Sequence, residues 1–92
     1  MTRLRRLIRN PAVSDTDVDG DVFLVEPENQ DVIYLNKLAS ALWRYLAEPR
    51  SRDEIVQVFE AAFPEVRRAR LLRDLAKAIG DLRRRGLIVA IR

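Results

Sequence analysis

The sequence predicts an α+β domain in which a small three-stranded antiparallel sheet is followed by three helices. Short apolar runs separated by turn residues occupy residues 12–35, and apolar residues at helical spacing occupy most of residues 37–85. Strand patterns that precede helix patterns in one short chain are typical of this fold class. A chain of 92 residues makes one domain with a thin hydrophobic core.

Three strands are expected before the first helix. Residues 12–17 form a weak first strand, and Asp19-Gly20 forms the turn after it, because glycine tolerates positive φ. Residues 22–26 form the second strand and residues 31–35 the third. The segment between them, Pro-Glu-Asn-Gln at 27–30, predicts a turn.

The first two helices have recognisable start signals. Asn36 stands where an N-cap belongs, before a helix over residues 37–47. Trp43 lies off the apolar stripe of this helix and is expected to cover its margin. Ser51 and Glu54 form a capping box that opens the second helix.

The third helix is predicted over residues 66–85 and is the longest of the three. Gly86 follows it, where a left-handed C-terminal cap is expected. Residues 87–91 then predict a short terminal strand or extended tail.

The charge is unevenly distributed along the chain. Residues 1–11 contain four arginines and no acidic residue, and we expect a flexible basic arm there, followed by the folded domain at 12–92. Residues 15–31 contain seven acidic residues and no basic one, whereas residues 32–92 have a net charge of +6. This polarity can orient a charged partner.

The composition argues against catalysis and cofactor binding. The chain has no cysteine and no histidine, so it lacks thiolate chemistry, the usual metal ligand and the usual general base. None of the serines has a histidine to activate it, and the three glycines form no phosphate-binding loop. Without a signal peptide or a membrane-spanning apolar run, we expect a soluble cytoplasmic protein with no membrane association.

One stretch matches the calcium-loop pattern of EF-hands. Its positions are filled by Asp15, Asp17, Asp19, Gly20 and Glu26. An EF-hand also needs a helix on each side of the loop, but Pro11 precedes this stretch and Pro27 follows it. We therefore interpret the acidic residues as a solvated turn that also protects a sheet edge, with calcium binding as the alternative.

Nucleic-acid binding is the main rival function. An arginine-rich third helix and a basic arm resemble a DNA-binding winged-helix regulator, which would lose salt-dependent duplex binding on changing Arg67, Arg70 and Arg73 to alanine. The acidic hairpin argues against this, because phosphates would repel it.

Several motifs in order resemble the PqqD family of leader-peptide-binding domains, also called RiPP recognition elements. They are the hairpin, the Tyr34-Leu35-Asn36 step into the first helix, the capped second helix and the terminal Arg85-Gly86-Leu87-Ile88. The resemblance spans residues 12–91. It implies a winged-helix-like fold without catalysis that binds the leader of a ribosomally made precursor peptide. It also implies that the bound leader is presented to a modifying enzyme. This enzyme is a radical-SAM protein in pyrroloquinoline quinone synthesis or a leader peptidase in lasso-peptide synthesis.

The family implies that the leader adds as a strand beside the third strand and lies against the third helix. An exposed strand edge accepts such a segment and also allows homodimerisation. The strand candidates are Asp31, Val32, Ile33, Tyr34 and Leu35. The helix candidates are Leu71, Asp74, Leu75 and Ala78 as a wall, with Arg67 and Arg70 to meet acidic leader residues. Ile33, Leu35 and Leu75 can equally be plain core residues.

Overall fold

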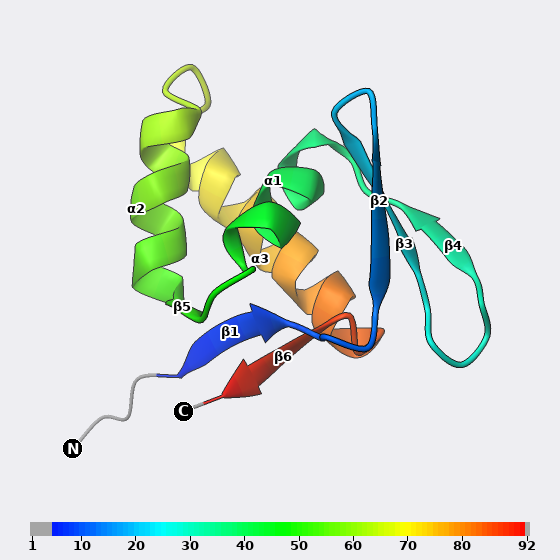
Figure 1. Cartoon of the computed structure of the whole chain (residues 1–92). Helices are drawn as coiled ribbons and strands as arrows, with labels where there is room; N and C mark the ends of the chain where they lie inside the picture. Colours follow the sequence, from blue (N-terminus) through cyan, green and yellow to red (C-terminus); the bar gives the residue numbers. More distant parts are fainter. Residues whose placement is uncertain (1–4, 92) are drawn as a thin grey trace.

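The computed structural model describes residues 5–91, which form three helices and two three-stranded antiparallel sheets (Figure 1). The α+β class is therefore confirmed. One sheet has the strand order β2-β3-β4 and the other β5-β1-β6. The elements are β1 (Arg6–Arg9), β2 (Ser14–Val18), β3 (Asp21–Val25), β4 (Val32–Tyr34), α1 (Lys37–Tyr45), β5 (Arg50–Ser51), α2 (Arg52–Ala62), α3 (Arg68–Arg84) and β6 (Ile88–Ile91).

The predicted hairpin is present as β2-β3-β4. Asp19 and Gly20 have φ angles of 54° and 89°, so both residues of the predicted turn adopt the left-handed conformation that a tight two-residue hairpin requires. Leu24 of β3 is fully buried, whereas its neighbours along the strand are half-buried. The sheet therefore turns one face toward the helices and the other toward solvent.

The helix boundaries follow the local signals in the sequence. The Asn36 side chain accepts a hydrogen bond from the Ala39 N–H at 2.8 Å, and Ser51 forms the complete capping box. Gly86 has a φ angle of 71°, and the Leu87 N–H donates to the Leu82 carbonyl across the end of α3 at 2.9 Å. These are the contacts of a left-handed helix C-cap, so the predicted cap is confirmed.

The second sheet departs from the expectation. We expected a flexible arm over residues 1–11, and this expectation is wrong for residues 6–9. They form β1, the central strand between β5 and β6. Leu7 is buried and anchors the strand in the core. The domain thus extends beyond the expected boundary at residue 12, while residues 1–4 lie outside the described part.

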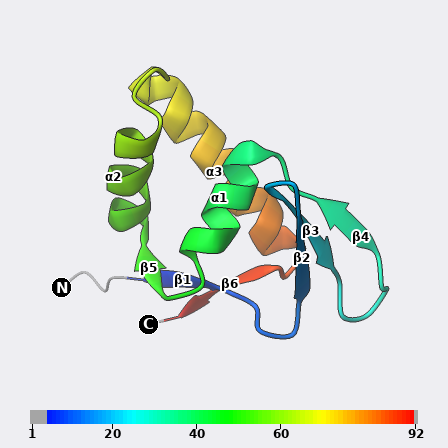
Figure 2. The same cartoon turned by 45° about the horizontal axis from the view of Figure 1, so that its top comes forward.

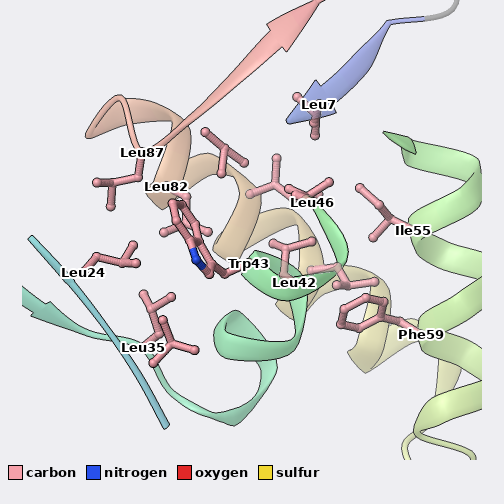
Figure 3. Close-up of a cluster of buried hydrophobic side chains, with 14 of the residues drawn as sticks. Leu7, Leu24, Leu35, Leu42, Trp43, Leu46, Ile55, Phe59, Leu82 and Leu87 are labelled. Carbon is pink, nitrogen blue, oxygen red and sulfur yellow. The ribbon is translucent and has the colours of Figure 1, made fainter. Parts of the chain in front are cut away.

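Trp43 also departs from the expectation, because it lies in the core and not at its margin. Its side chain is 1% exposed and belongs to the hydrophobic core cluster, together with Leu24 of β3 and Leu82 of α3 (Figure 3). Its Nε1–H donates to the Asp15 carboxylate at 2.7 Å, and the Arg9 guanidinium lies 5.2 Å from the ring centroid. Trp43 therefore links the two sheets.

Ser40 of α1 joins the hairpin to the helix through two buried hydrogen bonds. Its hydroxyl accepts from the Val22 N–H at 3.1 Å and donates to the Leu35 carbonyl at 3.0 Å. These bonds hold the chain where it passes from β4 into α1. No helix within residues 5–91 combines the length and the apolar composition that a membrane span needs.

We expect Ser40→Ala to lower the free energy of unfolding by about 1–3 kcal/mol, because it leaves buried backbone groups without partners. Urea denaturation followed by circular dichroism measures this loss. The control is Ser14→Ala on the exposed β2 strand, which is expected to change stability by less than about 0.5 kcal/mol. Equal stability of the two variants would contradict the role given to Ser40.

Candidate functional site

The β4 strand lies at an edge of its sheet. Among residues 5–91 it pairs with β3 alone, and its other side carries no strand (Figure 2). The register sets Phe23 opposite Tyr34 and Val25 opposite Val32. An edge of this kind presents unpaired backbone groups to an incoming chain.

The backbone groups of β4 divide between its two sides. The Leu35 N–H donates to the Val22 carbonyl at 2.9 Å, which continues the ladder with β3. Hydrogen-bonded pairs alternate along an antiparallel ladder, so Ile33 also turns its backbone groups toward β3. The N–H and C=O groups of Val32 and Tyr34 therefore point to the open side, where another strand can pair with them.

A groove of about 450 Å³ lies between β4, the start of α1 and the C-terminal part of α3. Apolar side chains and a row of charged side chains on α3 share its walls. The lining residues are Ile33, Tyr34, Leu35, Asn36, Leu38, Ala39, Asp74, Lys77, Ala78, Asp81, Leu82 and Arg85. The groove can therefore take an apolar side chain while polar groups of the same ligand meet the α3 charges.

The charges along this wall are already paired on the helix surface. The Lys77 Nζ lies 3.2 Å from a carboxylate oxygen of Asp81, and the Arg70 Nε lies 3.6 Å from a carboxylate oxygen of Asp74. Exposed pairs of this kind contribute at most about 1 kcal/mol each. A bound ligand can therefore replace them with its own charged groups at little cost.

The structure brings together part of the predicted site. Ile33, Tyr34, Leu35, Asp74 and Ala78 all line the groove. Asp31 and Val32 are exposed next to it along the chain. The remaining candidates lie elsewhere: Leu71 and Leu75 are each 2% exposed in the core, and Arg67 and Arg70 are exposed at the N-terminal end of α3.

Sequence reasoning missed the groove residues on α1 and near the end of α3. Asp81, Leu82 and Arg85 continue the face of Asp74 and Ala78 at helical spacing, so extending that face by two turns would have found them. The α1 residues Leu38 and Ala39 carried no such signal.

The acidic residues of the calcium-loop pattern are bonded to other side chains. Asp15 accepts from Trp43, and Asp17 pairs with Arg44 at 2.5 Å. The hydrogen bond from Arg44 lowers the pKa of Asp17, and the Gly20 N–H adds to this effect. Within the described residues, no three acidic side chains stand where they can hold a metal ion.

Comparisons with known proteins identify the family of this chain. The family model described as "Coenzyme PQQ synthesis protein D (PqqD)" matches residues 21–88. The solved structure "TbiB1 in Complex with the TbiA(beta) Leader Peptide" is similar with a TM-score of 0.77 and 26% identity, over 88% of this chain and 93% of TbiB1. No curated protein sequence matches. Since the family model covers the segment from β3 to the first residue of β6, the chain belongs to the PqqD family.

Proposed function

We propose that this chain is a non-catalytic module that binds the leader of a ribosomally made precursor peptide by strand addition to β4. The open side of β4 beside an apolar groove carries the proposal. Family membership and the likeness to TbiB1, which is bound to a leader peptide, support this class of ligand. The encounter is proposed for the cytoplasm, where such precursors are made.

The energetics assign different roles to the strand and the groove. The four outward backbone groups of Val32 and Tyr34 can form hydrogen bonds worth about 1 kcal/mol net each. A Kd of about 1 μM needs about 8 kcal/mol, so the strand supplies about half of that at most. Apolar leader side chains in the groove must supply the rest. Because backbone bonds are indifferent to sequence, the groove also sets the specificity.

The proposal includes a winged-helix-like arrangement of the helical part. β5 lies between α1 and α2, and β6 follows α3, as the strands of a winged helix do. Here β1 lies between them and completes the small sheet. The receiving enzyme is proposed to be a radical-SAM protein or a leader peptidase. The module itself is proposed to need no cofactor.

Val32→Pro is expected to weaken leader binding about tenfold or more without unfolding the domain. Proline removes the N–H that faces the open side, and its ring obstructs an incoming strand. The ladder with β3 is preserved, because proline is tolerated where an edge strand turns its N–H to solvent. Isothermal titration with the leader of the precursor encoded beside this chain's gene measures the affinity.

The matched control is Val32→Ala, which shortens the side chain and retains the N–H. It is expected to bind the leader within about threefold of wild type. If both variants bind equally well, strand addition at β4 is wrong. Duplex DNA is the second ligand to titrate: salt-dependent binding that disappears when Arg67, Arg70 and Arg73 become alanine would favour the regulator alternative.

A further inference from the structure

A second groove, of about 410 Å³, lies beside β6. We name it the β6 groove. The four residues of β6, at 88–91, line it together with Gly86, Arg83 and Arg5. None of these residues lines the groove beside β4, so the β6 groove is a separate site on the other sheet.

The β6 strand is an edge of its sheet. Within the described part of the chain it pairs with β1 alone, and Figure 1 shows no strand on its other side. The Asn10 N–H donates to the Leu87 carbonyl at 2.9 Å, so Leu87 turns its carbonyl toward the β1 side. Because these groups alternate along an antiparallel ladder, the N–H and C=O of Ala90 point to the open side. Ile88 points the same way but is 1% exposed, so the half-buried Ala90 supplies the accessible groups.

Two arginines give the β6 groove a positive charge. Arg5 and Arg83 are both exposed, and within residues 5–91 neither forms an ion pair. No acidic residue lines this groove, whereas Asp74 and Asp81 line the groove beside β4. Guanidinium groups bind carboxylates through charge-assisted, often bidentate hydrogen bonds. The β6 groove therefore favours an extended acidic segment.

The C-terminal end of α3 separates the two grooves. Leu82 and Arg85 line the groove beside β4, and Arg83 and Gly86 line the β6 groove. Figures 1 and 2 show this end of α3 between the two sheets. The longest dimension of the domain is 35 Å, which about eleven extended residues span. One peptide can therefore occupy both grooves by passing around the end of α3.

We propose that the β6 groove binds an acidic segment of the same precursor peptide whose apolar residues occupy the groove beside β4. The inference rests on the proposed leader-binding function and adds a second recognition element to it. The carboxylates of the segment meet Arg5 and Arg83, while its backbone pairs with Ala90. The acidic stretch over residues 15–31 repels such a segment and so favours its placement on the basic sheet.

The tether to the anchored part of the peptide makes this second contact effective. A flexible link to a bound peptide gives the acidic segment an effective concentration of about millimolar. Exposed ion pairs that are weak by themselves then raise the affinity of the whole peptide. A free acidic peptide without the apolar anchor lacks this advantage.

The test uses Arg5→Gln/Arg83→Gln, which removes both charges of the β6 groove and retains polar side chains. Arg52→Gln/Arg73→Gln is the matched control, since both arginines are exposed, line neither groove and form no ion pair within residues 5–91. One probe is the leader of the precursor encoded beside this chain's gene. The other, the amide leader, has every Asp and Glu of that leader replaced by Asn and Gln.

At low salt, the wild type is expected to bind the native leader about tenfold more tightly than the amide leader. Arg5→Gln/Arg83→Gln is expected to reduce this preference at least fivefold, whereas the control variant retains it. High salt is expected to remove most of the preference. Isothermal titration measures the affinities. In NMR spectra, the native leader is expected to shift the amide of Ala90 as well as those of Val32 and Tyr34.

An unchanged preference for the native leader in Arg5→Gln/Arg83→Gln would overturn the inference. A leader that shifts the amides of Val32 and Tyr34 but not that of Ala90 would also overturn it, and so would a tightly bound leader without acidic residues. A homodimer that the double variant dissolves would assign the β6 groove to the acidic stretch of a second copy instead. Failure of the wild type to bind leader, with no shift at Val32 and Tyr34, would overturn the proposed function itself.

Discussion

Ala78→Trp is expected to reduce leader binding at least a hundredfold. Ala78 is half-buried on the groove wall of α3, where an indole would occupy space that the leader side chains need. A hundredfold loss corresponds to about 2.7 kcal/mol. That is the scale of burying one large apolar side chain, about 1.5–3 kcal/mol. Fluorescence anisotropy of a labelled leader measures the affinity.

The matched control for this variant lies on the same helix. Ala76 is exposed on the solvent side of α3, so Ala76→Trp introduces the same side chain away from the groove. It is expected to bind leader with wild-type affinity, and circular dichroism checks that both variants fold. If Ala78→Trp binds within threefold of wild type, the groove is not where leader side chains lie.

The hairpin and the helices could be predicted from the sequence because their signals are local. Asp19-Gly20 specifies a turn by its own conformation, and the caps at Asn36 and Ser51 bond to groups three residues away. In the second sheet only β6 was indicated, as a short terminal strand or extended tail over residues 87–91, and the other two strands had no such signal. The central strand of this sheet, β1, pairs with β6 near the other end of the chain, and the basic composition of residues 1–11 predicted a flexible arm there instead.

Only part of the candidate site could be predicted, because the β4 edge follows from the order of strands whereas the groove depends on how the helices pack. The edge position of β4 follows from the order of strands, which the sequence and the family resemblance both indicate. The side of α3 that faces the groove depends on how the helices pack, and a helical pattern does not reveal that. Leu71 and Leu75 were therefore assigned to the groove wall, although they are buried in the core, while Asp81 and Leu82 were missed.

Trp43 also shows that a helical pattern does not reveal which sides of a helix are covered. A helical wheel assumes one covered side, but α1 packs against α3 and also against β3 of the β2-β3-β4 sheet. The position that appeared marginal faces Asp15 and the sheet. Burial on two sides makes this single tryptophan a central packing residue.

Trp43→Ala is expected to lower the free energy of unfolding by about 3–5 kcal/mol, the usual cost of deleting a large buried aromatic side chain. A domain of this size has a total stability of about 5–14 kcal/mol, so the loss is a large fraction of it. The expected fall in Tm is at least about 12 °C. Thermal and urea denaturation, followed by circular dichroism because the chain has no other tryptophan, measure both quantities.

Trp43→Phe separates ring packing from the hydrogen bond. It retains an aromatic ring but loses the Nε1–H donor to Asp15, and a bond to a charged acceptor is worth about 1.5–3 kcal/mol. Asp15→Ala removes the same bond by deleting its acceptor. The double variant is therefore expected to lose less free energy of unfolding than the sum of the losses in the two single variants. Strict additivity would show that the indole stabilises the fold by packing alone. The link between α1 and β2 would then not depend on the Asp15 contact.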